Sequence, residues 1–211
     1  MRVTIVSGGF KPSRFLLKDQ IKKSDVVICA DSGANCFFEY KLTPNYLLGD
    51  FDSIEKNILD FFKNEKCIVE KFPPEKDFTD TELALSKAIE LGAKEIVFLG
   101  CTGSRMDHFF GNLALLYKCM KNSIKASIKD DNNKIFLTCK NVSLSGNYGE
   151  YFSVMPFSEM VGNLSILGAK YELVDYDLKK GDALTVSNEF IDNTVTISFS
   201  SGILIVFYSQ D

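Results

Sequence analysis

The pattern that most constrains the fold is the alternation of short Val- and Ile-rich runs with helix-length segments. It extends over about the first 125 residues and predicts parallel strands joined by helices. The expected strands are Arg2–Val6, Asp25–Ala30, Tyr46–Leu48, Cys67–Lys71 and Glu95–Leu99. The expected helices are Pro12–Lys23, Ala34–Tyr40, Ile54–Asn64, Asp80–Leu91 and His108–Lys121. Residues 1–124 are therefore predicted to form an α/β domain with a mostly parallel sheet and flanking helices.

From Ile124 onward the pattern changes to alternating β-branched and aromatic segments separated by Gly, Asn and Asp. The clearest expected strands are Ile124–Ile128, Lys134–Thr138, Tyr151–Pro156, Thr194–Phe199 and Ile203–Tyr208. The segment 200–202 is expected to join the last two as a hairpin turn. Residues 125–211 are therefore predicted to form an antiparallel β-sandwich domain.

Charge, apolar runs and cysteine spacing exclude several classes of protein. The net charge is −4 and the basic residues are scattered, so nucleic acid is not an expected partner. The longest apolar runs are strand-sized, well below the ~20 residues of a membrane helix, and the N-terminus carries no secretory signal pattern. The six cysteines form no Cys-x-x-Cys pair, which fits buried thiols in a reducing compartment. We expect a cytoplasmic protein.

Acidic residues gather just beyond the expected strand ends. Because the carboxyl ends of parallel strands share one edge, where ligands bind in open α/β sheets, these acids are expected to converge. Six acids share this placement, either directly after a strand or at the start of the following helix: Asp31, Asp50, Asp52, Asp77, Asp80 and Asp107.

Two interpretations of these acids are open. Aspartates before helices are common N-caps and favourable partners of the helix dipole. A helix start needs only one cap, however, and segments 49–53 and 77–80 each contain an extra acid. Crowded carboxylates repel one another unless a cation compensates them. All-oxygen ligands suit Mg²⁺ bound with a nucleotide, whereas zinc is disfavoured because His108 is the sole histidine and no cysteine pair accompanies it.

Phosphate binding also needs donors, and two glycine-containing loops can provide them. The loop 100–105 contains Gly103 and ends at Arg105, whose planar guanidinium suits phosphate. Gly8 and Gly9 follow the first strand and can bring backbone amides near an anion. Tight turns after strands also use glycine, so each cluster alone is weak support, and no Walker A sequence is present.

The ordered set of motifs resembles the thiamine pyrophosphokinase family over nearly the whole chain. The motifs are Ala30-Asp31-Ser32-Gly33-Ala34-Asn35, Gly49-Asp50-Phe51-Asp52-Ser53, Asp77-Phe78-Thr79-Asp80, Gly103-Ser104-Arg105-Met106-Asp107-His108 with Asn112, and Ser187-Asn188-Glu189-Phe190. Two serines, Ser32 and Ser104, stand where the family often has glycine. The chain also has no Trp to serve as an aromatic platform.

The resemblance implies transfer of the diphosphoryl group of ATP to thiamine, with Mg²⁺ as cofactor, in a homodimer whose active site is shared between subunits. The implied metal ligands are Asp50, Asp52, Asp77 and Asp80. The implied catalytic residues are Asp52, Asp80, Arg105 and Asp107. The residues expected to bind substrates, or to orient them with their metal, are Gly8, Gly9, Asp31, Gly103, Arg105, His108, Asn112, Ser187 and Asn188. Asn112 can equally support the loop, and Ser-Asn is also a common turn dipeptide.

Two other functions use the same acids. A haloacid-dehalogenase-type phosphatase also places Asp-x-Asp after a buried strand, with Asp50 as the nucleophile. That class leaves Asp80 and Arg105 unexplained, and its acids would follow a strand near the N-terminus. A non-catalytic nucleotide or divalent-ion sensor needs the acids but no alcohol substrate.

Overall fold

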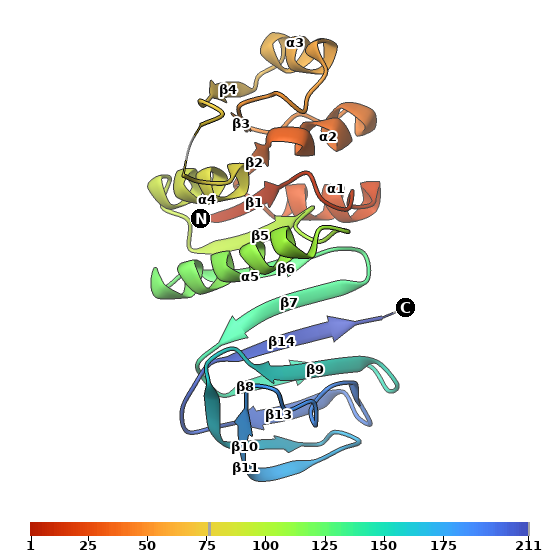
Figure 1. The fold of residues 1–211 in the computed structure, drawn as a ribbon. Helices are drawn as coiled ribbons and strands as arrows, with labels where there is room; N and C mark the ends of the chain where they lie inside the picture. Colours follow the sequence, from red (N-terminus) through yellow and green to blue (C-terminus); the bar gives the residue numbers. More distant parts are fainter. Residues whose placement is uncertain (76, 211) are drawn as a thin grey trace. The chain divides into compact units, whose positions relative to one another are not determined.

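The computed structural model describes residues 1–75 and 77–210. The chain divides into two compact units, Met1–Asp131 and Asn132–Asp211. The first unit is built on parallel strands and the second on antiparallel strands (Figure 1).

The described strands of the first unit are parallel and lie in the order β6-β5-β1-β2-β3-β4. Their bounds are β1 Arg2–Val6, β2 Val26–Ala30, β3 Tyr46–Gly49, β4 Ile68–Lys71, β5 Glu95–Leu99 and β6 Lys125–Lys129. From β1 the chain builds outward through β2, β3 and β4, and then returns to the other side of β1 with β5. The strand order therefore reverses between β1 and β5, and the carboxyl ends of these strands border a topological switch point.

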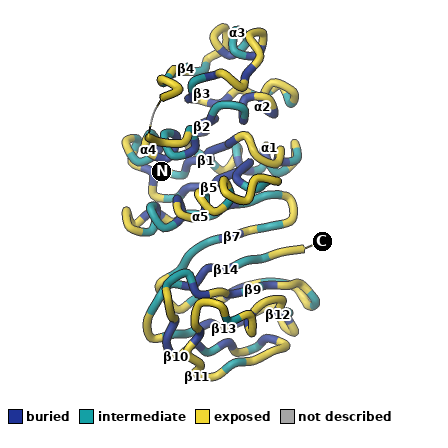
Figure 2. Tube along the Cα trace, viewed as in Figure 1, coloured by how far each residue is buried: buried dark blue, intermediate teal, exposed yellow. Residues whose placement is uncertain are grey.

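Helices cover both faces of this sheet. Their bounds are α1 Arg14–Lys22, α2 Ala34–Tyr40, α3 Lys56–Asn64, α4 Asp80–Glu90 and α5 Met106–Lys121, with a 3₁₀ turn, η1, at Asp31–Gly33. Leu17, Phe37 and Phe62 bring α1, α2 and α3 onto one core, together with side chains from β1, β2, β3 and β5. Helix α4 packs on β1, β2 and β3, and α5 contacts α4 and β6. The central strands are therefore buried on both sides (Figure 2), which explains their nearly continuous apolar sequences.

The second unit is an antiparallel sandwich. One sheet contains β12, β9, β14 and β7 in that order, and the other contains β11, β10, β13 and β8. The bounds are β7 Asn133–Thr138, β8 Val142–Ser145, β9 Tyr151–Pro156, β10 Met160–Leu167, β11 Leu173–Lys179, β12 Asn188–Glu189, β13 Thr194–Ser198 and β14 Leu204–Ser209. Phe152 and Val206 from the first sheet share one core with Leu164 and Ile197 from the second. The predicted fold class, an α/β domain followed by a β-sandwich, is confirmed.

The predicted boundary at residue 124 is displaced, because the units divide after Asp131. Strand β6, assigned from its sequence to the β domain, pairs in parallel with β5, with Lys125 opposite Glu95. Helix α5 is thus the crossover of a β5-α5-β6 unit. The mixture of exposed and buried side chains in β6 resembles the alternation of the sandwich strands, so the local pattern is misleading.

The predicted hairpin across residues 200–202 is wrong. Strand β13 pairs with β8 and β10, whereas β14 pairs with β7 and β9 in the other sheet. The Ser200 N–H donates to the Gly162 carbonyl at 2.9 Å, which ties this turn to β10. Gly202 has φ +97°, a conformation that glycine adopts without a steric penalty. The turn residues signal a reversal of the chain, but they do not specify which sheet receives the next strand.

Candidate active site

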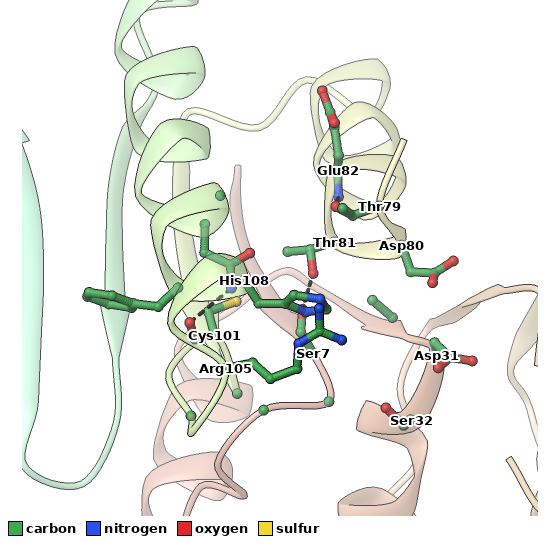
Figure 3. Close-up of a pocket in the computed structure, with 18 of the residues that line it drawn as sticks. Ser7, Asp31, Ser32, Thr79, Asp80, Thr81, Glu82, Cys101, Arg105 and His108 are labelled. Atoms are coloured by element: carbon green, nitrogen blue, oxygen red, sulfur yellow. Dashed lines mark hydrogen bonds between the residues drawn. The ribbon is translucent and has the colours of Figure 1, made fainter. Parts of the chain in front are cut away.

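A cavity of about 1060 Å³ lies at the carboxyl edge of the parallel sheet. It is lined by the loops after β1, β2, β3 and β5 and by the first turns of α4 and α5. The acidic Asp31 and Asp80 lie on one side, with Arg105 and His108 on the other (Figure 3). The cavity thus occupies the switch point between β1 and β5, where a ligand is expected in this fold class.

Three carboxylates converge on the acidic side of the cavity. Asp31, Asp50 and Asp52 each place one oxygen within 4.8 Å of the others. They meet because they follow β2 and β3, which are neighbours in the sheet. The Asp52 N–H also donates to Asp50 Oδ1 at 3.2 Å, which orders the short turn between them. Phe51 is buried between these two acids, so both side chains remain on the cavity side of the turn.

Asp31 is the most constrained of these acids. Its Oδ1 atom is buried and has no hydrogen-bond partner among the described residues. Its backbone has φ +42°, which is strained for a residue other than glycine. Burial raises its pKa above the ordinary value, a hydrogen bond from the Ser32 backbone opposes this shift, and the nearby charges of Asp80, Asp50 and Asp52 add to it. A half-buried carboxylate with one buried, unpartnered oxygen beside three other acids is unfavourable without a cation.

This donor set fits Mg²⁺. The ion prefers hard oxygen ligands and keeps several of its own waters, so a few carboxylates at a partly open cavity suffice. Asp31 Oδ1 supplies an unsatisfied acceptor for the ion, and the three clustered acids supply the negative charge.

The structure groups the acids differently from the sequence interpretation. Asp80 lines the cavity as the first residue of α4 and lies close enough to Asp31 to affect its pKa. Asp77 is exposed and is not among the described residues that line the cavity. Asp31, expected to bind substrate or a second metal, instead joins Asp50 and Asp52 in the closest cluster. Sheet adjacency brings these acids together, and sequence spacing does not reveal it.

The basic side of the cavity is formed by the loop after β5. Arg105 makes a two-pronged contact with Asp107, from Nε to Oδ1 at 3.2 Å and from NH2 to Oδ2 at 2.6 Å. The hydrogen bond from Arg105 is the main cause that lowers the pKa of Asp107 to about 2. His108 lines the cavity and is exposed. Asn112 Nδ2 donates to the Cys101 carbonyl at 2.9 Å, so this side chain supports the loop.

Glycines in the loops after β1 and β5 allow neighbouring segments to pack closely. The Gly9 N–H donates to the Gly100 carbonyl at 2.7 Å, and a Cβ on Gly9 would meet that oxygen at 2.6 Å. The predicted contact of the Gly9 amide with phosphate is therefore not supported, because the loop after β5 already occupies that donor. A Cβ on Gly8 would collide with the Ser32 hydroxyl, so Gly8 permits the approach of η1. Gly103 lines the cavity in more open surroundings.

Two polar pairs that line the cavity are not anticipated as part of a site by the sequence. Ser7 and Thr81 share a buried hydroxyl–hydroxyl hydrogen bond of 2.9 Å. Lys118 of α5 forms an ion pair of 2.8 Å with Glu82 of α4. The helix period gives a partial signal for Lys118, which lies on the same face of α5 as His108 and Leu115. Ser7 and Thr81 have no comparable signal, because their pairing depends on the packing of α4 over β1.

In the second unit, the structure separates Ser187 from Asn188. Ser187 is exposed and has φ +57°. Asn188 is 2% exposed, and its amide accepts from the Tyr171 N–H at 3.0 Å and donates to the Tyr171 carbonyl at 2.8 Å. The predicted contact of Asn188 with substrate is therefore replaced by a structural role, because both polar atoms of its side chain are engaged by backbone.

Fold and cavity together define a class of protein: a two-domain chain whose α/β unit carries an acidic cavity at the carboxyl edge of its parallel sheet. Comparisons with known proteins identify the family. Residues 17–128 match the family described as "Thiamin pyrophosphokinase, catalytic domain". Residues 139–204 match "Thiamin pyrophosphokinase, vitamin B1 binding domain". The chain belongs to the thiamine pyrophosphokinase family.

Individual relatives agree with this assignment over the full length. A thiamine pyrophosphokinase from Bacillus subtilis is 34% identical over 216 residues, covering 99% of each chain. A crystal structure of thiamine pyrophosphokinase from the same organism has a TM-score of 0.88 at 33% identity and covers 100% of both chains. A thiamin pyrophosphokinase family protein from Enterococcus faecalis gives 0.87 at 27% identity with the same coverage.

Among the described residues, no helix has the length and apolar character needed to cross a bilayer.

Proposed function

We propose that the chain transfers the diphosphoryl group of ATP to the hydroxyl of thiamine, giving thiamine diphosphate and AMP. The hydroxyl oxygen forms a bond to the β-phosphorus, the bond from that phosphorus to the α–β bridging oxygen breaks, and AMP leaves with that oxygen. The hydroxyl proton passes to solvent or to a cavity carboxylate. The observation that carries the proposal is the convergence of Asp31, Asp50 and Asp52 opposite Arg105 in one cavity, within this family.

Asp31, Asp50 and Asp52 would hold Mg²⁺, with Asp80 beside them. When bound, the ion neutralises phosphate charge and fixes the orientation of the polyphosphate. The carboxylates of this cluster also give the cavity a negative field, which suits the positive thiazolium ring of thiamine. We place Asp77 outside this metal cluster, since it is exposed and distinct from the described lining.

Arg105 is proposed to bind the transferred phosphates, because a planar guanidinium can contact two phosphate oxygens at once. Asp107 orients Arg105 through the two-pronged contact until phosphate arrives. His108 and Gly103 border the same space and can donate to the polyphosphate from side chain and backbone. Asn112 acts indirectly, by fixing the Cys101 carbonyl and thus the loop.

Covalent catalysis by the cavity thiol is disfavoured. Burial raises the pKa of Cys101 to about 12, so the thiol stays protonated at neutral pH. Transfer therefore relies on positioning and charge neutralisation, which are the main contributions in phosphoryl-transfer enzymes.

The test incubates the purified protein with ATP, Mg²⁺ and thiamine and separates AMP from ADP by chromatography. AMP and thiamine diphosphate should appear in equal amounts, and omission of thiamine should abolish AMP release. Formation of ADP, or release of inorganic phosphate through an aspartyl-phosphate, would contradict the proposal. Thiamine-independent nucleotide binding without turnover would instead favour a sensor.

We further propose a homodimer in which Ser187 of one subunit serves thiamine at the other's acidic cavity. Support comes from exposed apolar side chains on β9 and β11, including Tyr151, Met155 and Val174, which a twofold mate would cover. Buried thiols such as Cys29 and Cys119 support a reducing, cytoplasmic location.

The shared site is tested by co-refolding Asp52→Asn with Ser187→Ala. In a mixed dimer, one shared site collects both substitutions and the other collects neither. About a quarter of all sites should then be intact in an equal mixture, so activity rises above either parent. If each site were built within one chain, every site would keep one substitution. No recovery, with heterodimers verified by mass spectrometry, would reject the shared site.

A further inference from the structure

Beneath the cavity, the end of β1 is joined to the start of α4 by one buried hydrogen bond. Ser7 Oγ and Thr81 Oγ1 lie 2.9 Å apart, and the residues are only 8% and 9% exposed. A buried hydroxyl without a partner is costly, so each of these side chains satisfies the other. Figure 3 shows the contact between the two charged sides of the cavity.

A third group, the thiol of buried Cys101, extends this contact. Ser7 lies close enough to this thiol to lower its pKa, against the larger raising effect of burial, and Cys101 lies in the loop that carries Arg105. The Cys101 carbonyl is in turn fixed by Asn112 of α5. Ser7 therefore connects the loop of the basic side with the helix of the acidic side.

The first turn of α4 places two neighbouring side chains on different sides of the helix. Thr79 caps the helix by accepting from the Glu82 N–H at 3.2 Å. Asp80 follows and lines the cavity near Asp31, whereas Thr81 points down to Ser7 (Figure 3). Rotation of α4 about its axis would move both side chains together. A fixed Thr81 thus fixes the direction in which Asp80 projects.

We infer that Ser7 and Thr81 are positioning residues that hold Asp80 toward the cation-binding acids through their buried hydrogen bond. This role deepens the proposed function and rests on it for its catalytic consequence. The orientation of Asp80 toward the other acids affects cation binding whether or not the proposed reaction takes place.

A second hydroxyl pair on β1, at the end of the strand away from the cavity, provides a matched control for the Ser7–Thr81 pair. Thr4 Oγ1 and Ser24 Oγ lie 2.7 Å apart, and Thr4 is fully buried. Ser24 precedes β2, at the end of the strand opposite to the cavity. Thr4→Val and Thr81→Val each remove one hydroxyl from a hydroxyl–hydroxyl pair at β1, but only Thr81 adjoins the acids.

The experiment measures Mn²⁺ binding to the full chain by EPR, together with thiamine-dependent AMP release and thermal unfolding. Thr81→Val should weaken Mn²⁺ binding and lower kcat, each by about 10-fold, with KM for thiamine unchanged, as is common for residues that orient metal ligands. Thr81→Ser, which keeps the hydroxyl, should recover both properties to within about threefold. Thr4→Val should lower the unfolding temperature but change Mn²⁺ binding by less than about twofold.

Ser7→Ala removes the same hydrogen bond from its other partner and decides the question if Thr81→Val does not fold. It should weaken Mn²⁺ binding similarly, and the double variant should be no worse than either single variant. Wild-type Mn²⁺ affinity in both single variants, or equal weakening by Thr4→Val, would overturn the inference. A wild-type protein that binds Mn²⁺ but releases no AMP with thiamine would instead refute the proposed function, and the comparison of Mn²⁺ affinities would still decide the role of Thr81.

Discussion

Asp31 in the first unit and Asn188 in the second differ in whether their buried polar atoms have hydrogen-bond partners. Asp31 has a buried oxygen without a described partner, near three other acids, on a strained backbone. Asn188 is almost fully buried, and Tyr171 engages both polar atoms of its amide. An unsatisfied buried polar atom is costly and indicates a place where a ligand supplies the missing contact. A buried polar atom that already has its hydrogen bonds indicates a structural role, even within a sequence motif that suggests binding.

The largest expected effect comes from the acid cluster. Asp52→Asn should lower thiamine-dependent AMP release by about 10³-fold, because it removes a charge that holds the cation while leaving the core intact. Unfolding temperature and AMP release are measured together. Asp60→Asn, which alters an exposed acid of α3 paired with Lys63, is the control and should retain activity. Normal turnover in Asp52→Asn would remove this residue from the metal site.

Arg105→Lys should have the next largest effect, a loss of about 10- to 100-fold in kcat, since an ammonium cannot reproduce the two parallel contacts of a guanidinium. Steady-state kinetics with varied ATP measure it. The control is Arg14→Lys in α1, where the guanidinium makes one long contact of 3.4 Å with the Tyr40 carbonyl. If the two variants behave alike, Arg105 has no role in transfer.

Asn188→Ala tests the structural side of the comparison. It leaves the Tyr171 backbone groups unsatisfied, and we expect a loss of about 2 kcal/mol in the free energy of unfolding, measured with urea. KM for thiamine should stay unchanged in the folded protein. Asn141→Ala removes an exposed amide that accepts from the Phe199 N–H and should cost clearly less. A large rise in KM without loss of stability would restore Asn188 to the binding site.

The smallest expected effect concerns Asp107, an exposed acid that is already paired with Arg105 in the structure. Its pKa, lowered to about 2 chiefly by the hydrogen bond from Arg105, should appear as a carboxylate titration in ¹³C NMR. Because the folded-state pKa is depressed, the contact persists above the ordinary pKa and is lost as pH falls through the folded value. Arg105→Ala should return the titration toward the ordinary aspartate range. An unchanged midpoint would show that the pair does not form in solution.

Local sequence patterns predicted most of the secondary structure and the chemical character of the site. Strands β1, β5 and β9 and helix α2 have the predicted bounds, because apolar runs and turn residues are local signals. The acids after β2 and β3 were recognisable because strand ends and ligand sites coincide in this fold class. The assignment of β6 and the pairing of β13 and β14 failed, since strand partners are chosen by sheet packing and not by neighbouring residues.

Residue types and their order were sufficient to specify an acidic, glycine-bordered site on an α/β unit followed by a β-sandwich, because these properties depend on local conformation and on side-chain chemistry. Tertiary packing decided which acids meet, which amides are already hydrogen-bonded and which hydroxyls face each other. Asp31 joins Asp50 because β2 lies beside β3, Gly9 loses its free amide to Gly100, and Thr81 reaches Ser7 because α4 crosses β1. Distances between residues far apart in the chain are set by the sheet, and no local pattern encodes them.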